Sequence, residues 1–175
     1  MQTRHISNGY HLRALDEYLA IKFCMKAEIE KHGLILIGKW ARSDKHSSVG
    51  HLKNNISFGI NFDVFPEWKN KTNVTYAFVV NGRVDYIGES TKGISSRFVG
   101  YRYGNPLVTD TDNRVKINIT KCLNEGVDVE IWAVSHFVDF VLPNGEKINV
   151  PISKPLEEHL IHKLSPNWNK KNLKY

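Results

Sequence analysis

Hydrophobic residues recur every three or four positions near the start of the chain. Between His11 and His32 they stand among charged residues, at Leu12, Leu15, Leu19, Phe23, Met25 and Ile29. This spacing predicts an amphipathic helix that faces the core or a dimer partner. Gly33 follows directly and is a typical helix end.

Short runs rich in β-branched and aromatic residues predict strands along the rest of the chain. These runs cover residues 33–41, 56–62, 74–88, 128–137 and 141–150. Two of them contain an Asn-Gly pair between apolar residues, at 81–82 and 144–145. Asn-Gly suits a tight turn in which both positions need positive φ, so each of these runs predicts a β-hairpin.

Three further helices are predicted between and after these strands. They cover residues 90–103, 113–126 and 156–164. Asp112 and Asn113 precede the second of these helices and carry side chains that cap a helix N-terminus. Gly126 and Pro166 mark the ends of the second and third, because neither residue continues a helix well.

A polar segment from Phe65 to Asn73, which contains Pro66, separates the first two strands from the others. We therefore predict two parts. Residues 1–71 form an N-terminal helix and a basic hairpin, and residues 72–175 form the core. The stretch from Ser43 to Asn55 between the first two strands has the composition of an exposed loop.

The composition of the 175 residues is that of one globular domain, with 41% hydrophobic residues. A net charge of +6 and a pI near 9.3 suit a polyanionic partner such as nucleic acid, although many small proteins carry such a surplus for solubility alone. The apolar stretches are far shorter than the roughly 20 residues that cross a bilayer. We expect an intracellular protein without membrane contact, in which Cys24 and Cys122 are reduced and buried.

Several polar residues follow one another at defined spacings in the second half of the chain. Tyr76 ends Val74-Thr75-Tyr76, and Tyr86 opens Tyr86-Ile87-Gly88, with 86 − 76 = 10 positions between the two tyrosines. Arg97 lies 97 − 86 = 11 positions further on. Glu157 precedes Pro166, and Asn169 follows Glu157 by 169 − 157 = 12 positions. This order resembles the motifs of the GIY-YIG nuclease family, in which the second half of the name motif matches fully and the first half keeps only its tyrosine.

The resemblance implies an α+β fold with a small central antiparallel β-sheet flanked by helices, the nuclease core of residues 72–175. The N-terminal helix and hairpin of residues 1–71 are then an embellishment for DNA binding or dimerisation. The resemblance also implies a set of catalytic residues. Tyr76 is the general base or positions the water, Tyr86 orients through its hydroxyl, Arg97 contacts the phosphate, Glu157 binds the metal and Asn169 acts near the phosphate. Many relatives have a histidine where this chain has Tyr101, so the base is either Tyr76 or Tyr101.

The residue types agree with phosphodiester hydrolysis. Mg²⁺ prefers carboxylate oxygen and needs only one or two such ligands when a substrate phosphate completes its shell, which suits Glu157. The planar guanidinium of Arg97 matches phosphate geometry. Tyr76 is harder to explain, because lowering the pKa of a phenol from about 10 to 7 takes roughly 4 kcal/mol. A nearby guanidinium and a metal ion can supply this. Glu89, directly after the YIG glycine, can add a second carboxylate near the metal.

Each of these residues also has a common structural role that would explain it when it is considered alone. A tyrosine on a strand usually packs, and an arginine or glutamate on a helix is usually a solvated charge. His159 and His162 flank Glu157, but we expect surface or supporting roles for them. The candidates for DNA contacts, which equally fit solvated surface, are Arg42, Lys45, Lys53, Arg102, Arg114 and Lys116.

The function that we predict is a stand-alone endonuclease that cuts double-stranded DNA and depends on Mg²⁺ or Mn²⁺. A type II restriction enzyme that works as a homodimer is the first expectation, because a twofold dimer supplies two active sites and matches a palindromic target. A phage-type endonuclease that degrades host DNA is the alternative within the same class. A DNA-binding module without catalytic activity is the alternative from another class.

Overall fold

The computed structural model describes residues 25–43, 59–103 and 110–169. Five of its strands form one sheet in the order β2-β1-β5-β3-β4. They are β1 (Ile35–Ser43), β2 (Gly59–Val64), β3 (Val74–Val80), β4 (Arg83–Ser90) and β5 (Val129–Ser135). Every neighbouring pair in this sheet is antiparallel. The predicted α+β class with a central antiparallel sheet is confirmed.

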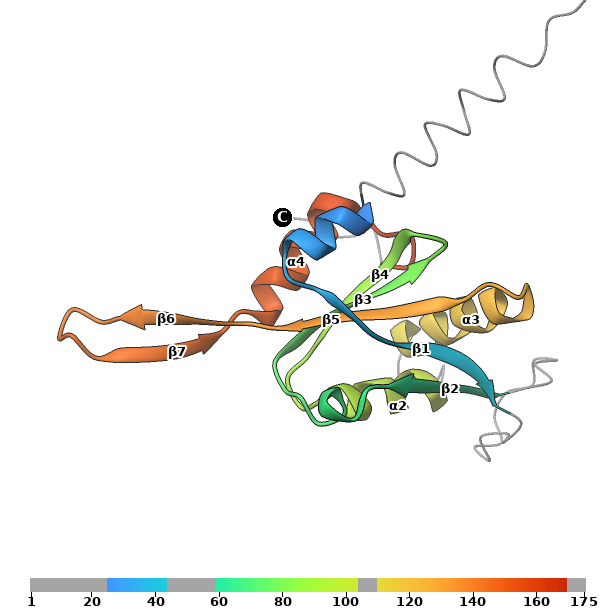
Figure 1. The fold of residues 1–175 in the computed structure, drawn as a ribbon, viewed down its shortest axis with the longest axis horizontal. Coiled ribbons are helices and arrows are strands. Elements are labelled where there is room, and N and C mark those ends of the chain that lie inside the picture. Colours follow the sequence, from blue (N-terminus) through green and yellow to red (C-terminus); the bar gives the residue numbers. More distant parts are fainter. Residues whose placement is uncertain (1–24, 44–58, 104–109, 170–175) are drawn as a thin grey trace, which may run out of the picture.

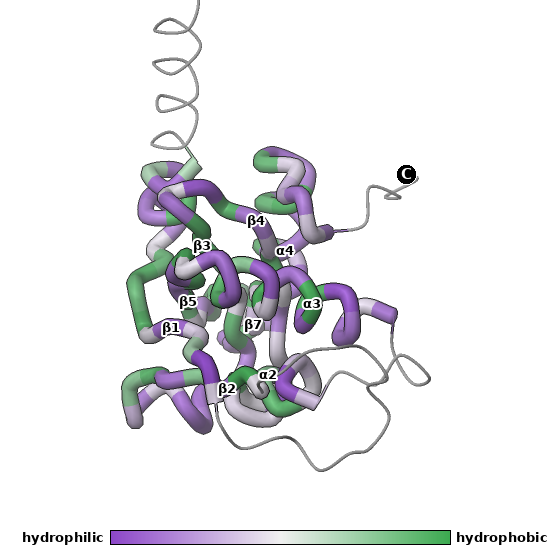
Figure 2. Tube along the Cα trace, turned by 90° about the vertical axis from the view of Figure 1, so that its right-hand side faces the viewer, coloured by the Kyte–Doolittle hydropathy of each residue, from purple (hydrophilic) through white to green (hydrophobic). Residues whose placement is uncertain are grey.

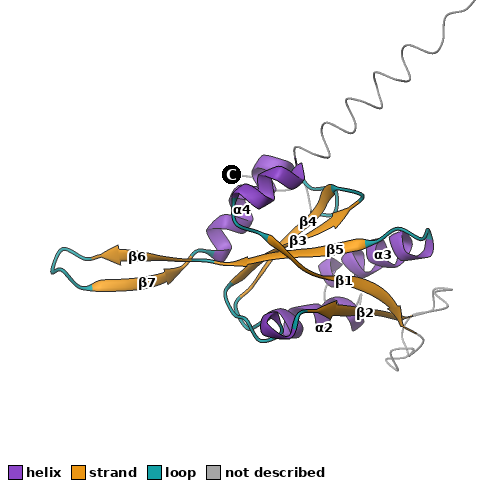
Figure 3. Ribbon diagram, viewed as in Figure 1, coloured by secondary structure: helices purple, strands orange, loops and turns teal. Residues whose placement is uncertain are grey.

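Helices cover both faces of the sheet (Figures 1 and 3). Helices α2 (Ile94–Tyr103) and α3 (Asp110–Asn124) pack on one face, and α4 (Ser153–Leu164) with the helical residues 25–31 packs on the other. Successive strand side chains point to opposite faces. Tyr76 and Phe78 therefore join the cluster under α2 and α3, whereas Ala77 and Val79 join the cluster under α4. This explains why β3 is buried along its whole length.

The N-terminal strands belong to the same sheet and core as the rest of the chain. Strand β1 pairs with β5 as well as with β2. Trp40 on β1 packs against Phe78 and Phe98, with ring centroids 5.7 and 5.5 Å away. The predicted division between residues 71 and 72 therefore falls inside one sheet and one hydrophobic cluster. The loop between β1 and β2, with Lys45 and Lys53, lies outside the described residues.

Both predicted Asn-Gly hairpins are present. Asn81 and Gly82 join β3 to β4 with φ values of 50° and 78°, as a type I′ turn requires. Strands β6 (Phe137–Val141) and β7 (Lys147–Pro151) form the second hairpin. Its loop has positive φ only at Gly145, where a side chain would be strained.

The β6–β7 hairpin is a separate two-stranded sheet that projects from the body (Figure 1). Residues paired across an antiparallel ribbon share a face. One face therefore carries two apolar pairs, Val138 with Val150 and Phe140 with Ile148. Every residue of β6 is exposed. Residues 137–151 contain Asp139, Glu146 and Lys147 as charged residues, a net charge of 1 − 2 = −1.

Helix boundaries differ from the expectations at three places. Helix α2 begins at Ile94 rather than Ser90, because Ser90 ends β4 and its hydroxyl donates to the carbonyl of Gly93 at 2.9 Å. Helix α3 begins at Asp110, so the predicted cap at Asp112 is wrong and this residue lies in the first turn. Helix α4 begins at Ser153, three residues earlier than expected.

Hydropathy along the chain follows this layered arrangement. Hydrophobic positions gather on the central strands, and hydrophilic positions are frequent on the outer turns of the helices (Figure 2). No helix within the described residues is both long and apolar enough to cross a membrane. Cys122 on α3 is a free, partly buried thiol, and Cys24 lies outside the described residues.

Candidate active site

The glycine of the Tyr86-Ile87-Gly88 motif makes room for the ring of Tyr76. Tyr76 on β3 pairs with Gly88 on β4 in the sheet register. A Cβ atom at Gly88 would lie 2.5 Å from the Tyr76 hydroxyl and 2.6 Å from its ring carbon Cζ. The missing side chain therefore leaves room for the Tyr76 ring over β4, and Tyr76 belongs to the lining of the adjacent cleft.

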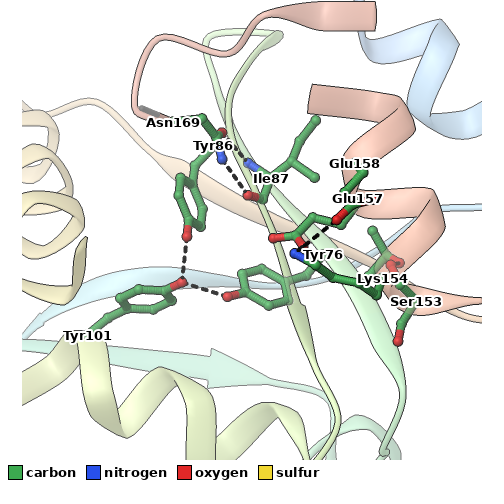
Figure 4. Close-up of polar contacts among 10 residues, drawn as sticks. Tyr76, Tyr86, Ile87, Tyr101, Ser153, Lys154, Glu157, Glu158 and Asn169 are labelled. Carbon is green, nitrogen blue, oxygen red and sulfur yellow. Dashed lines mark hydrogen bonds and ion pairs between the residues drawn. The ribbon is translucent and has the colours of Figure 1, made fainter. Parts of the chain in front are cut away.

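Three tyrosine hydroxyls form a chain of hydrogen bonds at this point (Figure 4). The hydroxyls of Tyr76 and Tyr101 are 2.6 Å apart, and Tyr101 donates to the hydroxyl of Tyr86 at 3.0 Å. Tyr76 and Tyr86 belong to the lining of the cleft, whereas Tyr101, on α2, does not. Tyr76 and Tyr101 are both completely buried. Tyr101 therefore bridges the two tyrosines of the cleft from behind.

Burial keeps these tyrosines protonated in the free protein. It raises the pKa of Tyr76 and of Tyr101 well above the ordinary value of 10.0, and that of Tyr86 above it. The charge of Arg97 acts in the opposite direction on all three pKa values, but burial outweighs it. The protein alone therefore does not supply the lowered pKa that a phenolate base requires.

Two contacts hold Arg97 next to these tyrosines. Its guanidinium carbon lies 4.2 Å from the centre of the Tyr101 ring, a cation–π contact. Its Nη1 donates to Asp112 Oδ1 at 2.7 Å. A Cβ atom at Gly100 would be 3.0 Å from Asp112 Oδ2 and 3.3 Å from Arg97 Nη1, so a side chain there would crowd the pair. Burial lowers the pKa of Arg97, but its interactions with Tyr76, Tyr101 and Asp112 outweigh this and raise it.

Asp112 is a residue of the site that the sequence did not identify. Its carboxylate is 14% exposed and faces Arg97 from the first turn of α3. Acidic residues are common in the first turn of a helix because they stabilise the helix dipole. The sequence therefore offered an ordinary reason for Asp112, and only the packing of α3 beside α2 reveals its contact with Arg97.

Glu157 enters the cleft from the first half of α4. Its side chain is 12% exposed, and its Oε2 accepts a hydrogen bond from the ammonium of Lys154 at 2.7 Å (Figure 4). Burial raises the pKa of Glu157, although the hydrogen bond from Lys154 lowers it. The spacing of three places both side chains on one face of the helix. Lys154 could thus have been found from the sequence once Glu157 was known.

Glu89 brings a second carboxylate to the same cleft. It follows Gly88 on β4, and its negative charge acts on both Glu157 and Lys154. Its Oε2 is buried and makes no hydrogen bond within the described residues. A buried carboxylate oxygen without a partner is costly unless a cation or an ordered water binds it. The pair Glu89 and Glu157 therefore fits a hard divalent cation.

These residues surround one cleft of about 660 Å³. Its lining includes Tyr76, Tyr86, Arg97 and Glu157, which are four of the six predicted catalytic residues. The charged residues of the lining are Lys92, Arg97, Lys154, Glu89, Asp110, Asp112 and Glu157. Three cations against four carboxylates give 3 − 4 = −1.

Asn169 contacts the backbone of β4. Its side-chain amide donates to the carbonyl of Ile87 at 2.8 Å and accepts from the amide of Ile87 at 3.0 Å. The backbone amide of Trp168 also donates to the carbonyl of Asp85 at 2.8 Å. The C-terminal segment thus covers the outer edge of β4 and fixes the strand beside Tyr86. The structure gives Asn169 this backbone contact and does not place it among the residues that line the cleft.

Four of the six residues predicted to contact DNA lie within the described part of the chain, and each has a contact within the protein. Arg42 donates to the carbonyl of Leu123 at 2.6 and 3.1 Å, at the end of α3. Lys116 is only 4% exposed, burial lowers its pKa, and its ammonium donates to the carbonyl of Tyr103 at 3.2 Å.

The remaining two described candidates have contacts of their own. Arg114 contacts Asp110 at 3.3 Å and the carbonyl of Trp168 at 3.2 Å, next to the cleft. The guanidinium carbon of Arg102 lies 5.6 Å from the centre of the Tyr103 ring. The two histidines beside Glu157 are exposed, and the ring of His159 lies 5.4 Å from that of His32.

Comparison with known proteins supports the fold. No family model and no curated protein matches the sequence. Among solved structures, a mutant of bacteriophage T4 EndoII shares 24% sequence identity with this chain at a TM-score of 0.55, and the match covers 83% of this chain and 98% of that one. The restriction endonuclease HPY188I in complex with product DNA shares 20% identity at a TM-score of 0.42, over 82% of this chain and 80% of that one.

Proposed function

We propose that this protein is a metal-dependent endonuclease of the GIY-YIG type that hydrolyses phosphodiester bonds of double-stranded DNA. The observation that carries the proposal is the cleft in which Arg97 and Glu157, from helices on opposite faces of the sheet, meet the hydroxyls of Tyr76 and Tyr86. These groups can bind a phosphate, hold a cation and position a water. The fold shared with EndoII of bacteriophage T4 is consistent with this proposal.

The charge of the cleft supports a requirement for Mg²⁺ or Mn²⁺. The lining carries a formal net charge of −1, and one divalent cation would change this charge to +1 and so favour a phosphodiester. Glu157 and Glu89 are the residues that would hold the ion, since two carboxylates and a substrate phosphate suit Mg²⁺. When bound there, the ion would supply charge neutralisation at the scissile phosphate and lower the pKa of a bound water.

The remaining roles in the reaction belong to separate protein residues. Arg97 presents a planar cation to the equatorial phosphate oxygens, where negative charge increases in the transition state. Asp112 and the Tyr101 ring hold the guanidinium in position before DNA binds. Tyr76 positions the attacking water and accepts its proton. Because burial raises the pKa of Tyr76 in the free protein, this acceptance needs the bound cation and Arg97 to stabilise the phenolate.

Tyr101 is a positioning residue in this scheme rather than the base. Its hydroxyl contacts Tyr76 and Tyr86 but does not line the cleft. A proton or negative charge on either cleft tyrosine can be shared through it, because hydrogen bonds to the charged form favour that form. We therefore assign the base to Tyr76.

A restriction enzyme that acts as a homodimer inside the cell is the first candidate for the biological role. Each chain has one such cleft among its described residues, so two chains are needed to cut both strands in one encounter. The apolar face of the β6–β7 hairpin, formed by Val138, Phe140, Ile148 and Val150, is a surface that a second chain can cover. A phage-type degrading endonuclease is the second candidate, and the fold shared with a phage protein favours it.

Cleavage of a supercoiled plasmid tests the proposal. We expect nicked and linear products with Mg²⁺ or Mn²⁺ and none after chelation with EDTA. Discrete fragments from a defined plasmid would indicate restriction, and a smear would indicate degradation. DNA binding without cleavage under any divalent cation would contradict the enzyme and leave the inactive DNA-binding module.

A further inference from the structure

We propose that Lys154 stands in for the divalent cation at Glu157 in the free protein and moves to the DNA backbone when the cation binds. This inference rests on the proposed function and adds a residue to it. The ammonium lies 2.7 Å from Glu157 Oε2 and 3.6 Å from Glu158 Oε1. Glu89, across the cleft, also acts on Lys154 through its charge. Lys154 thus faces the carboxylates that a cation would face.

Lys154 lies at an unfavourable position of the helix that carries it. It is the second residue of α4, where the partial positive charge of the helix N-terminus disfavours a cation. The first turn contains no acidic residue, and no side chain caps the N-terminus. Its ion pairs with Glu157 and Glu158 offset this disadvantage, so the carboxylates are what hold the lysine here.

The lysine is also free to move. Its side chain is 60% exposed and belongs to the lining of the cleft, whereas Glu157 is largely buried. A lysine side chain carries a compact charge on a flexible four-carbon stem. A divalent cation on Glu157 would repel the ammonium and replace its hydrogen bond. The proposal gives the displaced ammonium the negatively charged DNA backbone in the same cleft as its new partner.

The first test is metal binding to the full-length protein without DNA. Calorimetric titration with Mn²⁺ should show tighter binding by Lys154→Met than by the wild type, by roughly two- to fivefold, the range expected when a partly exposed ion pair no longer competes. Lys92→Met is the matched control, because it removes another exposed lysine of the cleft lining and leaves the Lys154–Glu157 contact intact. Equal affinities of wild type and Lys154→Met would overturn the inference.

The second test is the salt dependence of DNA binding. With Ca²⁺ in place of Mg²⁺, the slope of log K against log salt should be less steep for Lys154→Met than for the wild type by about 0.9, one phosphate contact. Without divalent cation the two slopes should agree. An equal difference in slope with and without Ca²⁺ would show a permanent phosphate contact and would contradict the proposed movement.

The two proposals fail in different ways. If the wild type neither binds Mn²⁺ nor cuts DNA with it, the proposed function fails. If the wild type cuts DNA but Lys154→Met binds Mn²⁺ as the wild type does, only the role of Lys154 fails.

Discussion

The cleft and the β6–β7 hairpin differ in how deeply their side chains are buried. At the cleft and directly behind it, Tyr76 and Tyr101 are completely buried, and each of their hydroxyls has a protein partner. In the hairpin, all five residues of β6 are exposed, and Phe140 is 54% exposed. Neither hydrophobic cluster of the core includes a residue of β6 or β7.

This contrast shows where function and stability are coupled. A change in the cleft removes a chemical group and also leaves buried partners unsatisfied, so rate and stability should fall together. A change on the outer face of the hairpin removes exposed atoms and should affect neither, unless a second chain covers that face.

The largest expected effect follows from Arg97→Ala. Loss of the guanidinium removes the group that stabilises charge on the phosphate, so single-turnover cleavage should fall by about 10²- to 10³-fold. Arg102→Ala on the same helix is the control, and its rate should stay within about threefold of the wild type because a surface arginine makes at most one exposed phosphate contact. Equal losses of cleavage rate in the two variants would contradict a specific role of Arg97 at the phosphate.

The next effect is the pH dependence of the cleavage rate. Cleavage at saturating Mg²⁺ should rise by up to about tenfold per pH unit between pH 6 and 9, as the pKa of a tyrosine base requires. A flat rate profile with chemistry limiting would contradict a phenolate base.

Stability should depend on pH as well. Tyr76, Tyr86 and Tyr101 have raised pKa values, so the folded protein holds these protons more tightly than the unfolded chain. This contribution to the free energy of unfolding is present below pH 10 and is lost as the pH rises further.

A smaller effect is expected for Tyr101→Phe. The change removes hydrogen bonds of 2.6 and 3.0 Å and leaves two buried hydroxyls without this partner. Stability should fall by about 1 to 3 kcal/mol, measured by denaturant unfolding. The rate should fall by about tenfold, less than the 10²- to 10⁴-fold typical of a direct acid or base. Tyr103→Phe, at an exposed tyrosine on the same helix, should change neither quantity.

The smallest effect on chemistry is expected from the hairpin. Val138→Thr with Phe140→Ser should change the stability of the single chain by less than about 0.5 kcal/mol, as at other surface positions. If this face joins two chains, the variant should become monomeric in analytical ultracentrifugation and produce nicks instead of double-strand cuts. An unchanged oligomeric state would exclude this face as the dimer contact.

The fold was accessible from the sequence because its signals are local. Asn81-Gly82 specifies a turn through the φ angles of two neighbouring residues, and the three-and-four spacing of apolar residues specifies a helix. The structure confirms both. The spacing of apolar residues did not predict that α2 begins at Ile94 or that α4 begins at Ser153. A helix start depends on contacts such as the hydrogen bond from the Ser90 hydroxyl to the carbonyl of Gly93, which this spacing does not encode.

The site was only partly accessible for the same reason. Sequence order identified Tyr76, Arg97 and Glu157, but their grouping around one cleft depends on how α2 and α4 pack against the sheet. Asp112 was not found because its partner lies 15 positions away on another helix. Asn169 was expected near the phosphate, whereas its amide binds the backbone of Ile87, a contact that no spacing rule predicts.

The central claim is that Glu157 holds the cation in the cleft where DNA is cut. Its most direct test compares the cleavage rates of the wild type and of Glu157→Gln under identical conditions. Glutamine keeps the shape of the side chain but removes the negative charge that would hold the cation. Single-turnover cleavage with Mg²⁺ should fall by at least about 10²-fold, while DNA affinity in Ca²⁺ should stay within about tenfold of the wild type. If Glu157→Gln cuts DNA at the wild-type rate, the cleft described here is not the site of cleavage.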